Sequence, residues 1–188
     1  MAYRAVDETW ISVDVETSGP TPSTGSLISI GACRLEDPGD GFSVDVQPIE
    51  GLPWLDSAEA VHGLTRERLA ATGVPPDEAM RAFEVWVQSA CGARRPVFVA
   101  LNAPFDWMFV ADYAWRFLGR NPFGHSAIDI KALYLGRHLG EVRRWDETGR
   151  LEMLGRYPVE LPHTHQALDD AREQAAILRA ILAGAGPD

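Results

Sequence analysis

The chain has 188 residues, of which 46% are hydrophobic, so it suits a single domain with a substantial core and is not expected to be disordered. There is no run of about 18 apolar residues, so no membrane span is expected. The first ten residues lack a basic stretch followed by an apolar one, so no signal peptide is expected. The formal net charge of −10 argues against a nucleic-acid surface built from lysine and arginine, although metal ions can replace such cations in a cleft.

Three strands are expected first in the chain. Residues 10–15 alternate between apolar and polar side chains, residues 27–35 are rich in isoleucine and small residues, and residues 42–49 form the third strand. The connections between them are short and rich in glycine, proline and aspartate, which favours antiparallel neighbours.

Helices and strands alternate in the remainder of the chain. The apolar run at 96–101 is typical of a buried parallel strand, and Pro104 suits the first turn of the helix that follows it. The other expected elements are helices at about 56–61, 65–71, 77–90, 104–118, 131–139 and 166–182, and a brief fifth strand at about 127–130. Residues 140–162 are polar and irregular and receive no assignment. The pattern predicts an α/β domain with a mixed five-stranded sheet flanked by helices.

The cysteines and arginines bear weakly on two further features, disulfide bonds and a basic surface patch. Cys33 and Cys91 form no Cys-x-x-Cys pair, so a disulfide framework is not indicated and a reducing cytoplasm fits. Arginines crowd one late stretch, where a solvated loop face is the simpler interpretation and a basic patch is the alternative. These are Arg137, Arg143, Arg144, Arg150 and Arg156.

Asp14 and Glu16 stand at the end of the first expected strand. Strand alternation places both side chains on one face, where two adjacent carboxylates repel each other unless a cation lies between them. The alternative is a solvated strand end that leads into a turn at 17–20.

A third carboxylate, Asp106, is expected on the first turn of the helix that follows the apolar strand. There it either joins a functional site or only complements the helix dipole, which is worth about 0.3–1 kcal/mol.

His165 lies at the start of the last helix, close to Asp169 and Asp170. A histidine beside acidic residues suggests a base that works near neutral pH, and helix capping is the alternative. If His165 is helical it shares a face with Asp169, whereas a His165 in the preceding loop lets Asp170 point at the same site. Together the three segments supply four carboxylates, the ligands that hard cations such as Mg²⁺ prefer in two-metal phosphoryl-transfer sites.

The order and spacing of these motifs resemble the DEDDh (DnaQ-like) 3′→5′ exonucleases of the ribonuclease H-like fold, which include proofreading subunits, ribonuclease T and oligoribonuclease. The resemblance covers about residues 10–182. Asp14, Glu16 and Thr17 match a D-x-E-[TS] motif, Asn102, Phe105 and Asp106 match N-x-x-F-D, and His165, Ala167 and Asp170 match H-x-A-x-x-D. The last match selects Asp170 over Asp169. Residues 61–65 resemble a V-H-G-[IL]-T stretch of the proofreading branch. Leu101 departs from the pattern, since many relatives have histidine there, and residues 146–163 match nothing.

The resemblance implies a two-metal hydrolase that acts on the 3′ end of single-stranded DNA or RNA and releases nucleoside 5′-monophosphates. Asp14, Glu16, Asp106 and Asp170 would hold two Mg²⁺ or Mn²⁺ ions, and His165 would deprotonate the attacking water. The candidates for substrate contact are Thr17, His62, Asn102 and Phe105, and Trp107 is a further candidate for base stacking. For Phe105 and Trp107, core packing is the stronger interpretation. Asp129 is expected to cap a helix, with a fifth site carboxylate as the alternative.

Other functions remain open at the level of sequence. They are an exoribonuclease for RNA ends or short oligoribonucleotides, a non-catalytic nucleic-acid-binding or scaffolding module, and a metal-dependent phosphatase or phosphodiesterase for small molecules. The resemblance is compatible with a homodimer and with a polymerase partner, but no residue selects either.

Overall fold

The computed structural model describes residues 7–161 and 164–184, so the ends of the domain expected over 1–188 lie outside the described residues. All five expected strands form one sheet in the order β3-β2-β1-β4-β5. Its strands are β1 (Glu8–Thr17), β2 (Leu27–Arg34), β3 (Gly41–Asp45), β4 (Arg95–Ala100) and β5 (Ala127–Asp129). β1, β2 and β3 are antiparallel neighbours, whereas β4 is parallel to both β1 and β5. The expected mixed five-stranded sheet is thereby confirmed.

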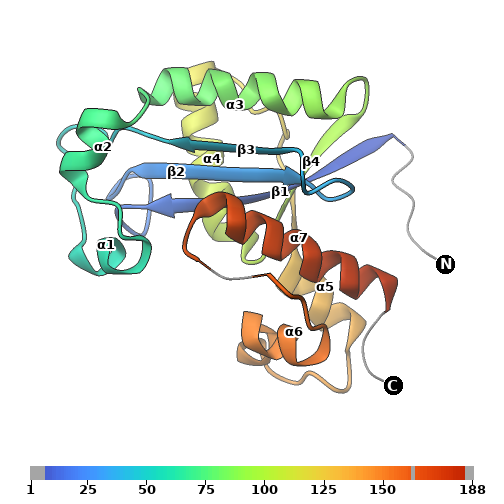
Figure 1. Ribbon diagram of the computed structural model, residues 1–188. Helices are drawn as coiled ribbons and strands as arrows, with labels where there is room; N and C mark the ends of the chain where they lie inside the picture. The colour runs from blue at the N-terminus through green and yellow to red at the C-terminus, as the bar shows by residue number, and fades with distance from the viewer. Residues whose placement is uncertain (1–6, 162–163, 185–188) are drawn as a thin grey trace.

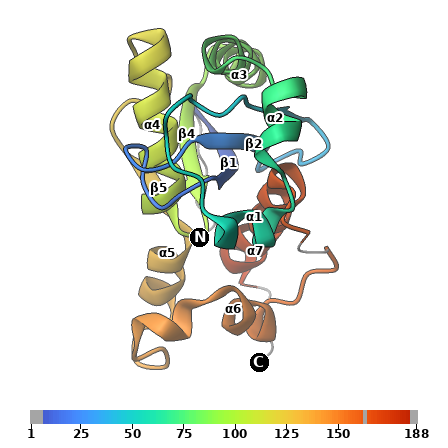
Figure 2. The ribbon, with the colours of Figure 1, turned by 90° about the vertical axis from the view of Figure 1, so that its left-hand side faces the viewer.

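Helices cover both faces of the sheet (Figure 1). α3 (Pro76–Cys91) and α4 (Ala103–Leu118) pack together on one face, and α7 (Ala167–Ala183) crosses β1 and β2 on the other. Figure 2 shows this layering from the side. The shorter helices are α1 (Asp56–His62), α2 (Arg66–Thr72), α5 (Ile130–Arg137), α6 (Arg150–Arg156) and the 3₁₀ helix η1 (Trp145–Thr148). No helix among the described residues is both long and apolar enough to cross a membrane.

The alternation in β1 divides its side chains between two cores. Ile11 and Val13 are fully buried against α3 and α4, and each such side chain stabilises the fold by about 1.5–3 kcal/mol. Trp10 packs into the second core, which α7 covers. Asp14 and Glu16 have the parity of Trp10, so they point to the α7 side of the sheet.

The parallel strands determine where the functional residues meet. β4 is apolar on both faces because Phe98 packs into one core and Val99 into the other. β1, β4 and β5 run in the same direction, so their carboxyl ends lie at one edge of the sheet, where α/β proteins bind ligands. The end of β1, the start of α4 and the end of β5 therefore come together there.

Several expected boundaries differ from the structure by one to four residues. β3 ends at Asp45 instead of residue 49, because Val46 forms only an isolated bridge with Val74 and Pro48 has no N–H to donate to a strand. α5 ends at Arg137 rather than residue 139. The unassigned stretch contains η1 and α6.

Cys33 and Cys91 are buried free thiols, and burial raises the pKa of Cys33 to about 12.

Candidate active site

A cleft of about 220 Å³ opens at the carboxyl edge of the parallel strands. It contains all four predicted metal-ligand carboxylates together with the predicted base. Its lining residues are Asp14, Val15, Glu16, Leu101, Asn102, Phe105, Asp106, Arg150, His165, Asp170, Glu173 and Gln174. Residues that are far apart in the chain therefore converge on one site, as the sequence predicted.

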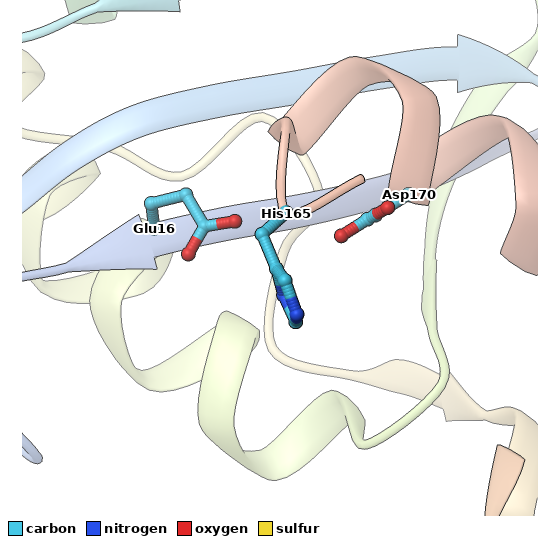
Figure 3. Close-up of side chains that lie close together, drawn as sticks. All are labelled: Glu16, His165 and Asp170. Atoms are coloured by element: carbon cyan, nitrogen blue, oxygen red, sulfur yellow. The ribbon is translucent and has the colours of Figure 1, made fainter. Parts of the chain in front are cut away.

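Three of these residues have the spacing of a metal centre. One ligand atom each from Glu16, His165 and Asp170 lies within 4.8 Å of the other two. Figure 3 shows that these side chains come from β1, from the loop before α7 and from α7 itself. No other group of this kind occurs among the described residues.

Protein hydrogen bonds hold the two remaining carboxylates at the cleft. The Val15 N–H donates to Asp106 Oδ1 at 3.2 Å, which joins the first turn of α4 to β1. Gln174 Nε2 donates to Asp14 Oδ1. Each aspartate has a second carboxylate oxygen that these two hydrogen bonds leave free for a cation.

Burial and mutual repulsion make three of the carboxylates weak acids. Burial, followed by the charges of Asp106, Glu16 and Asp170, raises the pKa of Asp14 well above its ordinary value. Burial and then the charges of Asp170 and Asp106 raise the pKa of Glu16 to about 8. Burial also raises the pKa of Asp106 to about 7. Such a cluster of oxygen ligands suits a hard divalent cation, whose charge would allow all of them to ionise near neutral pH.

His165 stands in the loop before α7, which decides between the two arrangements that the sequence left open. Its φ of 53° is the only positive value for a non-glycine residue in the described part of the chain. The Thr164 N–H donates to Asp170 Oδ1 at 3.0 Å, so the loop is attached to that carboxylate. Asp169 does not line the cleft, and it forms an ion pair with Arg172 at 3.6 Å.

Asp129 caps helices rather than lining the cleft. Its Oδ1 accepts the Ala132 N–H at the start of α5 at 2.7 Å, which confirms the expected helix cap. Its Oδ2 accepts the Ala103 N–H at 2.8 Å. One side chain therefore caps both α5 and α4, the helix that carries Asp106.

The structure separates the candidates for substrate contact into two groups. Asn102 and Phe105 line the cleft, although Phe105 also packs against Phe109 at 5.4 Å between ring centroids. Thr17 and His62 are not among the described residues that line it. The roles of all four stay predictions.

Thr17, His62 and Trp107 make local contacts outside the cleft lining, although the buried Nε2 of His62 has no hydrogen-bond partner among the described residues. The Thr17 hydroxyl donates to the Gly19 carbonyl at 2.9 Å, and buried His62 accepts the Leu64 N–H at Nδ1 at 3.0 Å. Trp107 packs edge-on against the Phe98 ring, which fits the expected core packing.

Sequence reasoning missed three polar residues of the cleft. Glu173 and Gln174 follow Asp170 by three and four residues on α7, and that helical spacing was a usable signal. Arg150 lies on α6, in the stretch for which the sequence predicted no secondary structure, so no helical pattern of residues pointed to it.

Comparisons with known proteins agree on one family. The family model described as "Exonuclease" (RNase_T) matches residues 11–178. The chain is 40% identical to the Escherichia coli "3'-5' DNA exonuclease Cap18" over 179 residues, which cover 95% of this chain and 94% of that protein. It is 29% identical to ribonuclease T of Yersinia enterocolitica, over 89% of this chain and 81% of that protein.

Solved structures share the fold. The nuclease domain of 3'hExo, a DEDDh family member bound to rAMP, aligns with a TM-score of 0.76 at 16% identity, covering 97% of this chain and 96% of that one. Escherichia coli Exonuclease I in complex with a dT13 oligonucleotide aligns with a TM-score of 0.71 at 15% identity, covering 90% of this chain and 40% of that one. The ribonuclease H-like fold expected from the motifs is thereby confirmed.

Proposed function

The chain belongs to the exonuclease family, and we propose that its substrate is single-stranded DNA. It removes nucleotides one at a time from the 3′ end of that strand. It is a 3′→5′ exonuclease, a phosphodiester hydrolase of a family that depends on divalent metal ions. The observation that carries the proposal is the convergence of four carboxylates and His165 from three separate segments on one cleft. DNA is favoured as the substrate because the relative at 40% identity is named a DNA exonuclease.

The donor set of the cleft fits two Mg²⁺ or Mn²⁺ ions. Asp14, Glu16, Asp106 and Asp170 would hold them, since hard cations take carboxylate oxygens and retain water ligands. When bound, such ions activate water and neutralise charge on the attacking and leaving oxygens. The raised pKa values of Glu16 and Asp106 support this assignment, because these groups ionise fully near pH 7 only with a cation nearby.

His165 acts as the general base. Its ring nitrogen accepts a proton from the attacking water, whose oxygen forms a bond to the terminal phosphorus. The bond from phosphorus to the 3′ oxygen of the preceding nucleotide breaks, which releases a nucleoside 5′-monophosphate, and the leaving 3′ oxygen takes a proton from solvent water to become the 3′ hydroxyl of the shortened strand. The position of His165 beside Glu16 and Asp170 supports this role.

RNA is the second candidate substrate. The ribonuclease T relatives, at 28–29% identity over most of their length, favour it. A protein reads RNA through its 2′ hydroxyl, and Asn102, whose side-chain amide can donate and accept hydrogen bonds, lines the cleft.

The deciding assay uses 5′-labelled single-stranded DNA and RNA oligomers of identical sequence with Mg²⁺, Mn²⁺ or EDTA. We expect a ladder that shortens from the 3′ end, faster on DNA, and abolished by EDTA. A faster ladder on RNA would reassign the substrate. Binding without any cleavage would make the chain a nucleic-acid-binding module and refute the proposal.

A further inference from the structure

Arg150 is the only arginine or lysine among the described residues that line the cleft. Two other members of the arginine-rich stretch form ion pairs away from the cleft, Arg144 with Asp146 and Arg156, at the end of α6, with Glu141. A solvated loop face therefore accounts for Arg144, whose side chain is exposed, and local pairing accounts for Arg156. Arg150 differs because α6 brings it from that loop to the edge of an otherwise acidic site.

A buried carboxylate on α7 fixes the orientation of the Arg150 guanidinium. Arg150 Nε donates to Glu173 Oε2 at 2.7 Å, and Nη2 donates to Oε1 at 2.5 Å. The Glu173 side chain is 2% exposed, whereas that of Arg150 is 25% exposed. A two-point bond of this kind holds the planar group in one direction, which a lysine cannot reproduce.

The other edge of the guanidinium stays available for a ligand in the cleft. The bond with Glu173 uses Nε and Nη2, which leaves the Nη1 amino group for another partner. The Glu173 hydrogen bonds, and then the charges of Glu173 and Asp170, raise the pKa of Arg150, which therefore remains charged within electrostatic reach of Asp170. A fixed cation beside the carboxylates is the natural complement of a phosphate that must approach an acidic cleft.

We propose that Arg150 binds a non-bridging oxygen of the scissile phosphate, and that Glu173 is the positioning residue that aims its guanidinium at the cleft. This inference rests on the proposed exonuclease function, because the scissile phosphate becomes the 5′-phosphate of the released nucleotide. The same contact then exists with the product, so it can be measured as binding without turnover.

The chain offers a matched control for a purely structural role of the ion pair. Arg120 and Glu84 form the same two-point bond at 2.7 and 2.9 Å, with Glu84 largely buried, at the α3 and α4 side of the sheet. Neither residue lines the cleft as the described residues define it. Arg120→Met removes a bond of the same geometry without touching the site, although the Arg120 side chain is more exposed, 67% against 25% for Arg150.

The experiment compares dTMP with thymidine as probes by calorimetry in the presence of Mg²⁺, together with kcat and KM on a DNA oligomer. Arg150→Met is expected to weaken dTMP binding and raise KM by about 10–100-fold, the range for hydrogen bonds to charged groups, while thymidine binding stays unchanged. Arg150→Lys should lose less, and Arg120→Met should match the wild type in both assays.

The role of Glu173 is tested by Glu173→Gln alone and combined with Arg150→Met. Glu173→Gln should raise KM with little change in kcat, and the double variant should be close to Arg150→Met, because the two-point bond with Arg150 is how Glu173 aims the guanidinium at the cleft.

Undiminished dTMP binding by Arg150→Met, or an equal loss of dTMP and thymidine binding, would overturn the inference. If Arg150→Met fails to fold, the same comparison is made with Arg150→Lys. A wild type that binds dTMP through Arg150 but cleaves no oligomer would refute the proposed function and the scissile-phosphate role with it, and would leave Arg150 only as a residue that binds a nucleotide phosphate.

Discussion

Gln174 on α7 donates from Nε2 to Asp14 Oδ1 on β1, while its Oε1 accepts the Leu101 N–H beyond β4 at 2.8 Å. One amide therefore joins a helix and two strands at the site and fixes the direction of the Asp14 carboxylate.

Gln174→Leu is expected to lower Mg²⁺ affinity by about 10–100-fold, the usual effect of removing a residue that hydrogen-bonds to a metal ligand. Calorimetric titration with Mg²⁺ measures it. Gln88→Leu, an exposed change on α3, serves as the control. Equal Mg²⁺ affinity in both variants would contradict the role of Gln174.

The general-base assignment predicts a loss of turnover without a loss of metal. His165→Ala should slow kcat by about 10²–10⁴-fold, the range for a positioned base. Mg²⁺ titration of the same variant should still show binding, because the four carboxylates remain. His125→Ala, an exposed histidine stacked on Trp115, should leave the rate unchanged. A His165→Ala enzyme with the wild-type rate at saturating Mg²⁺ would exclude the base role.

Asp170 and its neighbour Asp169 differ in placement, and their variants should differ in activity. Asp170 is 2% exposed in the cleft, whereas Asp169 forms its ion pair with Arg172 outside it. Asp170→Asn should abolish exonuclease activity, and Asp169→Asn should retain it, as measured by release of nucleotide from a labelled oligomer. The reverse result would assign the ligand to Asp169.

The raised pKa of Glu16 predicts how the stability of the metal-free protein depends on pH. Its pKa is about 8 in the folded chain against an ordinary 4.5, so its contribution is fully present below 4.5 and is lost as the pH rises through 8. In EDTA the wild type should therefore lose Tm relative to Glu16→Gln as the pH rises from 4.5 to 8. A difference of 1 kcal/mol corresponds to about 2–4 °C.

Added Mg²⁺ should reverse this trend in the wild type. The cation binds the ionised carboxylates of the folded state, so it should raise Tm more at pH 8 than at pH 4.5. Glu16→Gln should show a smaller rise. Parallel pH profiles for the wild type and Glu16→Gln in EDTA would mean that Glu16 does not titrate as its buried position requires.

Gly31 on β2 allows the start of α7 to approach the sheet. A Cβ at this position would lie 2.0 Å from the Ala167 carbonyl carbon and 2.1 Å from the Leu168 nitrogen, both backbone atoms. Gly31→Ala should destabilise the fold by about 1–3 kcal/mol and lower activity, because the displaced segment begins two residues after His165. The measurements are urea unfolding and oligomer cleavage.

Gly136 within α5 is the matched control, since nothing lies within 4 Å of its added Cβ. Gly136→Ala should be neutral or stabilising by about 0.4–1 kcal/mol, with full activity. If both alanine variants behave alike, the close approach at Gly31 is not what positions α7.

The sequence by itself determined the strands, the principal helices and the identity of the acidic residues. Alternation in β1 placed Asp14 and Glu16 on one face, because the side chains of a strand alternate regardless of what packs on them. The helical spacing of α3 and α4 and the apolar run of β4 were equally local signals. The order of the motifs then pointed to one shared site.

Only the tertiary structure decided which side chains surround those carboxylates. Gln174 contacts Asp14 across 160 positions of sequence, and Arg150 meets Glu173 because α6 lies beside α7. Likewise β3 ends early through a single bridge between Val46 and Val74. Periodicity reports the face on which a residue lies within its own element. The distance between two elements depends instead on how helices pack on the sheet, which a local pattern does not contain.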